Sequence, residues 1–197
     1  MSPPEATRES AGVMIAAPRL AELRSEHASV RDEAWRVLYD EHFDAIYRLV
    51  CRFGVPLAEV EDLTQMVFER AHRRMADVDE VRHVGVWLRG IAVRVVAEHR
   101  RWQRVRRLRQ WLLESTTEAA LRREPTPEQM TAAAHTQRRV GAVLDQMSRK
   151  LREVLVLVEI DECSPEEAAA VLGIPTNTVR SRRRLAREQF RKLWGNA

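Results

Sequence analysis

Hydrophobic residues recur with the period of an α-helix along most of this chain. Gly54 and Pro56 interrupt the first such stretch, because glycine and proline both end helices. No segment alternates apolar and polar residues as a strand does, and glycine is scarce. The pattern therefore predicts an all-helical (all-α) fold. The periodic positions of the first stretch are Trp35, Leu38, His42, Ile46, Leu49 and Phe53.

The predicted helices fall into two groups separated by a change in composition. The first group continues with helices over 57–75 and from about 86 past 101. A very basic run over 103–110 and a mixed stretch with two prolines follow, and the helical pattern resumes near 136. We therefore predict two small helical domains joined by a linker. The expected boundaries are a tail over 1–29, a first domain over 30–104, a linker over 105–135 and a second domain over 136–194.

The segment from Ser164 to Phe190 has the pattern of a helix-turn-helix. Ser164 is a favourable N-cap, Pro165 suits the first helical position, and Glu167 completes a capping box. Gly173 and the following Ile-Pro end this helix, because glycine tolerates the left-handed conformation at a helix C-terminus. The second helix of such a motif enters the DNA major groove.

The second helix of this motif separates its apolar and polar residues. Val179, Ala186, Phe190 and Leu193 form one apolar stripe at helical spacing. Arginines dominate the opposite face, and arginine binds guanine edges with two hydrogen bonds or pairs with phosphates. A surface helix with solvated arginines is the plainer alternative, but capping, turn chemistry and the division of faces together favour DNA binding. The polar face comprises Asn177, Arg180, Ser181, Arg184, Arg187 and Arg191.

The helix predicted over 57–75 also has two faces. We expect the apolar side, formed by Leu63, Met66, Val67 and Ala71, to pack inward. The other side is a solvated acidic face or a surface that docks a protein, and the residues alone leave these two alternatives open. On that side lie Asp62, Gln65 and Glu69, with Phe68 at the border as a partly exposed anchor.

The helix predicted from Trp87 to Trp102 combines aromatic and basic residues. Trp87, Ile91, Val95 and Trp102 form its apolar stripe, and core packing is the plainer reading of each tryptophan. Another face pairs arginines with small residues, so a sugar-phosphate chain could approach closely between two guanidinium groups. Such a basic surface beside aromatic rings suits single-stranded nucleic acid. The arginines are Arg94 and Arg101, with Arg89 and Arg100 beside them.

Composition narrows the function class. The net charge of +4 comes with clustered arginines, which favour a polyanionic partner such as nucleic acid. Cys51 and Cys163 fit neither zinc spacing nor a disulfide framework, and they suit a reducing cytoplasm. We expect no membrane insertion, since no apolar run approaches the ~20 residues of a membrane helix, and no signal peptide. No phosphate loop, metal-spaced histidines or nucleophile motif occurs, so we expect no enzyme, metal or cofactor.

Two ordered parts of the chain resemble the extracytoplasmic-function (ECF) sigma factors of the sigma-70 family. LYDEHFDAIYRLV, EDLTQMVFERAHRRM and VWLRGIAVRVVAEHRR resemble the conserved region two of that family. The segment LDQMSRKLREVLVLVEIDECSPEEAAAVLGIPTNTVRSRRRLARE resembles region four. The resemblance implies a cytoplasmic bacterial protein that binds core RNA polymerase and promoter DNA, both duplex and melted, and is commonly held by an anti-sigma factor.

The resemblance also implies roles for individual residues. In the family, the motif written here as Asp62-Leu63-Thr64-Gln65 with Phe68 docks on a coiled coil of the polymerase. This favours the docking alternative for the acidic face. Its residues are Asp62, Leu63, Gln65, Phe68 and Glu69. The helix from Trp87 and the loop before it open and read the minus-ten element, and the residues on that helix are Trp87, Arg89, Arg94, Arg100 and Arg101. The minus-thirty-five element is read by Asn177, Thr178, Arg180, Ser181, Arg184 and Arg187.

Several positions depart from the family pattern. Met66 stands where an acidic residue is usual, Arg94 where asparagine is usual, and Ser148 where proline is common. Arg183 and Leu185 are exchanged relative to the usual order of basic and apolar residues. These departures bear on base preference more than on the role.

A free-standing helix-turn-helix regulator is the main alternative, and it predicts a dimer on palindromic sites. It leaves the Asp62 face and the Arg94 and Arg101 face without a purpose. A nonspecific nucleic-acid-binding module is the third alternative, and it predicts uniform, salt-dependent affinity.

Overall fold

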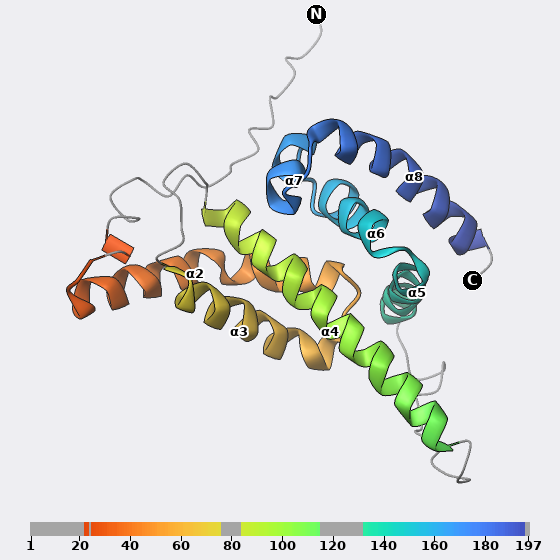
Figure 1. Ribbon diagram of the computed structural model, residues 1–197, viewed down its shortest axis with the longest axis horizontal. Coiled ribbons are helices and arrows are strands. Elements are labelled where there is room, and N and C mark those ends of the chain that lie inside the picture. Colours follow the sequence, from red (N-terminus) through yellow and green to blue (C-terminus); the bar gives the residue numbers. More distant parts are fainter. Residues whose placement is uncertain (1–21, 24, 76–83, 115–131, 196–197) are drawn as a thin grey trace, which may run out of the picture.

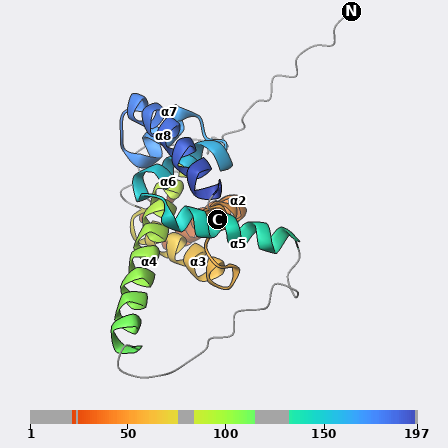
Figure 2. The ribbon, with the colours of Figure 1, turned by 90° about the vertical axis from the view of Figure 1, so that its right-hand side faces the viewer.

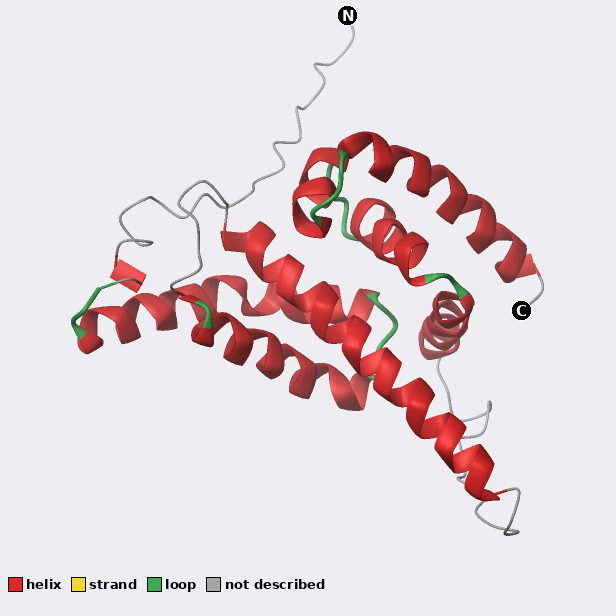
Figure 3. Ribbon diagram, viewed as in Figure 1, coloured by secondary structure: helices red, strands yellow, loops and turns green. Residues whose placement is uncertain are grey.

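The computed structural model describes residues 22–23, 25–75, 84–114 and 132–195. Within these ranges the elements are helices and no strand occurs, so the all-helical prediction is confirmed (Figure 3). A loop is expected over 76–85 between the second and third predicted helices; residues 76–83 of it lie outside the described residues, and 84–85 are already helical. Most of the expected tail and the centre of the expected linker also lie outside the described residues. The helices are α2 (Ala28–Arg52), α3 (Leu57–Arg73), α4 (Val84–Glu114), α5 (Ala132–Gln146), α6 (Arg149–Leu155), the π-helix η3 (Val156–Ile160), α7 (Pro165–Leu172) and α8 (Thr176–Gly195).

The first domain consists of α2, α3 and the N-terminal part of α4, which pack against one another. Gly54, with φ of +74°, ends α2 and turns the chain toward α3. The periodic positions of α2 face this core as predicted, and Leu49 has no exposed surface. Val60 and Val67 of α3 and Leu88 of α4 are also fully buried. Burying a side chain of this size stabilises the fold by about 1.5–3 kcal/mol.

The second domain consists of α5 to α8, and its core lies between α6, η3 and α8. Val156 and Leu157 of η3 are fully buried, and the apolar stripe of α8 packs onto the same core through Val179 and Ala186. Arg139 joins α5 to the C-terminal end of α8 by stacking its guanidinium 4.2 Å from the ring centre of Trp194. These contacts make α5 part of the second domain.

The two domains lie against each other along one side of α4 (Figures 1 and 2). The N-terminal half of α4 contacts α7, and the buried residues of both domains form one continuous cluster. The C-terminal part of α4 extends away from both domains (Figure 1). Because α4 reaches Glu114 and α5 begins at Ala132, both ends of the stretch expected as a linker over 105–135 are helical.

Candidate nucleic-acid and protein interfaces

The turn between α7 and α8 forms as its residue types predict. The Ser164 backbone N–H donates to the Glu167 carboxylate over 2.8 Å, and the Glu167 N–H donates to the Ser164 hydroxyl over 3.1 Å. Gly173 ends α7 in the left-handed conformation, with φ of 64° and ψ of 39°. The carbonyl of Pro175 then accepts the first hydrogen bonds of α8. The capping box and glycine stop therefore hold α8 at a defined angle to α7.

The polar face of α8 is open to solvent. Thr178 is half-buried, and the Ser181 hydroxyl donates to its carbonyl over 3.0 Å. Side chains that project from a helix buried only along its other stripe can enter a DNA groove without refolding the domain. The exposed residues on this face are Asn177, Arg180, Ser181, Arg184 and Arg187.

The exposed arginines of α8 form two loose ion pairs. Arg180 pairs with Glu166 over 3.0 Å, and Arg184 pairs with Glu188 over 3.1 Å, with more than half of each side chain exposed. Pairs of this kind contribute about 0–1 kcal/mol. A DNA phosphate or a guanine edge can therefore replace either glutamate at little cost.

Arg183 and Arg187 share a more enclosed partner, the Glu159 carboxylate of η3. Arg187 donates to both its oxygens, over 2.9 and 2.7 Å, and Arg183 donates to one. Burial opposes the charge of Glu159, but the hydrogen bonds from Arg187 and Arg183 outweigh it and lower its pKa below the ordinary value. Arg183, one of the departures from the family pattern, therefore ties α8 to the core of its own domain.

An aromatic cleft opens between α2 and α3, with a volume of about 380 Å³. Phe68 lies at its base, with its ring centre 4.7 Å from that of Tyr39 and 6.2 Å from that of Trp35. Phe68 is only 3% exposed, so the expectation of a partly exposed anchor is wrong. The aromatic residues of α2 cover it, and this cover could not be read from α3 alone. The residues that line the cleft are Trp35, Tyr39, Gln65, Phe68, Glu69, His72 and Arg73.

Asp62, Gln65 and Glu69 lie exposed on the outer side of α3, as predicted. Leu63 packs inward as expected and is buried beneath this face. Met66 is 39% exposed, and its expected place in the inward stripe is wrong. Leu63, Val67 and Ala71 occupy the buried face of α3, and Met66 lies beside exposed Gln65.

The arginines predicted on α4 separate into two groups. Arg94 and Arg101 are exposed, whereas Trp87 and Arg89 are half-buried. Arg100 is only 5% exposed, which contradicts its expected place on an open nucleic-acid surface. The second domain covers it, and its guanidinium donates to the Asp145 carboxylate of α5 and to the backbone carbonyl of Phe53.

Trp102 is 72% exposed, so its expected place in the inward apolar stripe is wrong. At this turn α4 still contacts the first domain, since Gln103 donates to Glu59 of α3 over 2.8 Å. The buried stripe therefore ends before the contact between the two helices does. Trp102 therefore belongs to the exposed, arginine-rich extension of α4, which includes Arg101, Arg104 and Arg106.

A second cleft, of about 420 Å³, lies between α3 and α4. Arg70 pairs with Glu98 across it over 2.6 Å. The α3 arginines here could not be identified as site residues from the sequence, because a run of basic residues is usual at a helix C-terminus. The lining residues are Arg70, Arg73, Arg74, Ile91, Arg94 and Glu98.

No helix within the described ranges is long and apolar enough to span a membrane. In that same part of the chain, no three His, Cys, Asp or Glu side chains come together as metal ligands would. Cys163 is buried, and burial raises the pKa of its thiol to about 12, so it is a poor nucleophile or ligand.

These features define a protein with two helical domains. A three-helix domain that bears polar and basic surfaces is followed in the chain by a domain with a DNA-binding helix-turn-helix. Two family models match the chain in this order: Sigma-70 region 2 over residues 38–106 and Sigma-70 region 4 over residues 137–190. The RNA polymerase sigma factor CnrH of Cupriavidus metallidurans is 33% identical over 178 residues, which cover 87% of this chain and 92% of CnrH. The chain therefore belongs to the ECF sigma factors of the sigma-70 family, which direct RNA polymerase to promoters and are not enzymes.

Solved structures share this fold. CnrH in complex with the cytosolic domain of CnrY superposes with a TM-score of 0.64 at 24% identity and covers 91% of this chain and 97% of that one. The sigma factor RpoE of Bartonella quintana, in complex with the anti-sigma factor NepR, superposes with a TM-score of 0.56 at 19% identity. That match covers 80% of this chain and 94% of RpoE.

Proposed function

We propose that this sigma factor docks on core RNA polymerase through α3, binds the melted minus-ten element with α4 and reads the minus-thirty-five element with α8. The observation that carries the proposal is the open polar face of α8, which the capped α7 and the turn at Gly173 hold in place. This motif follows, in the chain, a domain that matches Sigma-70 region 2. The proposed division into a first domain over 30–104 and a second over 136–194 follows this separation of tasks. A protein that serves polymerase on the chromosome works in the cytoplasm.

The proposed docking face combines exposed polar groups with a preformed cleft. Asp62, Gln65 and Glu69 supply hydrogen bonds and charge, and the aromatic cleft beside them offers a recess for an apolar side chain of the partner. Leu63 and Phe68 act from beneath by holding the backbone and the cleft floor in place.

The proposed DNA contacts fall on two helices. On α4, Arg94 and Arg101 are available to the phosphates of a single strand, and Trp87 and Arg89 lie beside them half-buried. Arg100 joins this set only when the second domain moves away. On α8, the proposed readers of the minus-thirty-five element are Asn177, Thr178, Arg180, Ser181, Arg184 and Arg187.

An anti-sigma factor is part of the proposal. The Bartonella relative of the same fold was solved with a partner of this kind. The exposed polar face of α3 and the aromatic cleft offer such a partner the same surface that polymerase would use.

Run-off transcription from a promoter library with purified core RNA polymerase tests the proposal. We expect core-dependent initiation at promoters that share two sequence elements. A chain that never joins the core is instead a free-standing helix-turn-helix regulator.

Gln65→Ala combined with Glu69→Lys tests the docking face. We expect this variant to bind core polymerase more weakly while its affinity for duplex DNA is unchanged. Glu33→Lys, which makes the same charge change at an exposed position of α2, is the control. Equal affinity of both variants for the core would exclude this face as the docking surface.

A further inference from the structure

The boundary between the two domains is held by two sets of ion pairs. In the first, the Asp161 carboxylate at the end of η3 accepts hydrogen bonds from Arg52 of α2 and, over 3.1 Å, from Arg89 of α4. The Asp161 side chain is only 5% exposed, although both arginines that pair with it come from the first domain. A carboxylate of the second domain is thus enclosed by guanidinium groups of the first.

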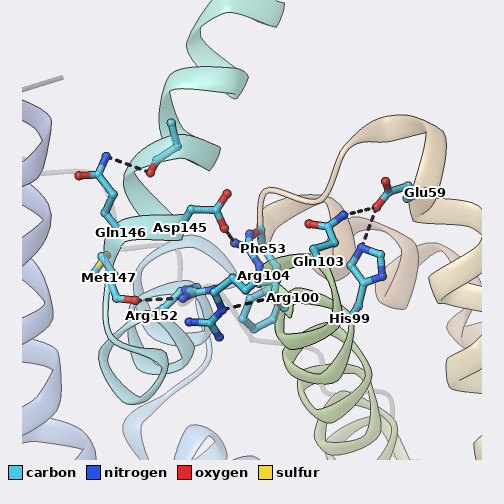
Figure 4. A network of polar contacts seen from close by, with 11 residues as sticks. Phe53, Glu59, His99, Arg100, Gln103, Arg104, Asp145, Gln146, Met147 and Arg152 are labelled. Carbon is cyan, nitrogen blue, oxygen red and sulfur yellow. Dashed lines mark hydrogen bonds and ion pairs between the residues drawn. The ribbon is translucent and has the colours of Figure 1, made fainter. Parts of the chain in front are cut away.

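The second set centres on Arg100, halfway along α4 (Figure 4). Its guanidinium lies between Asp145 of α5 and the carbonyl of Phe53, and it donates to both. Arg100 is among the few charged residues described as buried, together with Arg152 of the second domain. An arginine of the first domain therefore completes a buried polar site that needs the second domain for its counter-charge.

Glycines allow the backbones to meet beside these ion pairs. A Cβ atom on Gly54 would lie 2.9 Å from the Cα of Gly141, closer than Cβ atoms in proteins approach their neighbours. A Cβ atom on Gly90 of α4 would lie 3.3 Å from the carbonyl oxygen of Val171 in α7. Two contacts of this kind, at separate points of one boundary, indicate that the surfaces fit each other in detail.

The contact between the two domains engages arginines that the proposed promoter binding uses. Arg89 and Arg100 lie on the helix proposed to hold the melted strand, and in this arrangement both donate to carboxylates of the second domain. DNA phosphates and these carboxylates therefore compete for the same guanidinium groups. Removing charges from water to form such pairs has a large cost, so these ion pairs contribute little net stability to a boundary where apolar residues of both domains also pack.

We propose that the two domains close on each other through a latch, formed by Arg52 and Arg89 on Asp161 and by Arg100 on Asp145, and that this closed form is an off state. The latch must open before the first domain binds the minus-ten element. The off state rests on the proposed function of α4, whereas the closure itself does not. A conformational equilibrium of this kind lowers apparent affinity by the fraction of molecules that are open.

Two kinds of variant open the latch by different means. Asp145→Asn with Asp161→Asn removes its carboxylates, and Glu33→Gln with Glu153→Gln is the control because those glutamates pair within one domain. Gly141→Leu inserts a side chain against Gly54 without a change in charge. Leucine has a higher helix propensity than glycine, so this substitution should not unfold α5. Ala142→Leu, at the exposed neighbouring position, is its control.

Small-angle X-ray scattering of the full chain, without polymerase or DNA, measures closure. We expect wild type and both controls to be compact, and both latch variants to have a larger radius of gyration with unchanged circular dichroism. We also expect both latch variants to bind a single-stranded minus-ten oligonucleotide about tenfold more tightly than wild type. This is the gain expected if about one wild-type molecule in ten is open and most variant molecules are open.

The outcomes separate the latch from the sigma role. An expanded wild type, or latch variants as compact as the controls, would overturn the closure. Expansion of the variants without a gain in oligonucleotide binding would overturn the off state while leaving the closure in place. If one latch variant loses the circular dichroism signal of its helices, it has unfolded, and the scattering of the other variant tests the closure. The two variants act differently, because the double Asp→Asn variant changes charge and Gly141→Leu changes only shape. Failure of run-off transcription alone would remove the sigma role and leave the scattering result unaffected.

Discussion

Arginines at the domain boundary and arginines on α8 have the same sequence character but different environments. Arg100 is 5% exposed and donates to a carboxylate of the other domain, whereas the side chains of Arg180 and Arg184 are 63% and 70% exposed. The α8 arginines pair with glutamates of their own domain, so they are available to DNA whether the domains are together or apart. The boundary arginines become available only after a movement of domains.

The difference shows that a charged pattern on a helix does not by itself define a binding surface. What decides is the position of the nearest carboxylate and whether water reaches it. Glu166 and Glu188 leave their arginines in water, where an ion pair contributes little. Arg100 is shielded from water where it faces Asp145, so removing either partner would leave a charge at the domain boundary without its counter-charge.

Arg100→Met should have the largest effect on stability. It keeps most of the apolar stem but leaves the Phe53 carbonyl and Asp145 without their donor. Breaking a buried pair costs about 3–5 kcal/mol, and since Asp145 is half-exposed we expect the lower end, about 3 kcal/mol of unfolding free energy. Urea denaturation followed by circular dichroism measures this loss.

Arg101→Met is the matched control for that experiment, because Arg101 is the exposed neighbour on the same helix. We expect it to change the unfolding free energy by less than about 0.5 kcal/mol. If the two variants unfold at the same urea concentration, Arg100 is not the structural residue that its burial indicates.

The fold and the local turn chemistry could be predicted because they depend on neighbours in the sequence. Helical periodicity identifies the inward positions of α2, and the Ser164 and Glu167 spacing predicts their reciprocal hydrogen bonds. Both are properties of one or two helical turns.

The environment of the site residues could not be predicted in the same way. Phe68 is covered by the aromatic residues of α2, and Arg100 by α5, which begins more than thirty positions later in the chain. Trp102 is exposed although its spacing placed it in the apolar stripe and the neighbouring Gln103 still contacts α3. Helical spacing assigns a residue to a face, but only tertiary packing decides what covers that face.

Arg184→Ala tests the exposed arginines of α8. If Arg184 contacts a guanine, we expect a loss of about 1–3 kcal/mol in affinity for the preferred minus-thirty-five sequence and a weaker preference at one base pair. Fluorescence anisotropy with cognate and mutated duplexes measures both. Lys192→Ala, at an exposed position near the end of α8, is the control.

An equal loss on every duplex, with a shallower dependence on salt, would assign Arg184 to the phosphate backbone instead. Unfolding should be unaffected in either case, because the partner of Arg184 is exposed Glu188. A large loss of stability would mean that the two groups of arginines do not differ as proposed.

Glu159→Gln should have the smallest effect and tests the intermediate case, an ion pair within one domain that is partly enclosed. The hydrogen bonds from Arg187 and Arg183 outweigh burial and lower the pKa of Glu159, so its charged form stabilises the folded state above the ordinary pKa of glutamate. That contribution is lost as pH falls through the lowered pKa of the folded state. At neutral pH we expect the substitution to cost at most about 1 kcal/mol, and urea denaturation at several pH values should show this difference from wild type disappearing in acid. A difference that persists in acid would mean that Glu159 acts through packing and not through its charge, and α8 would then be held by its apolar stripe alone.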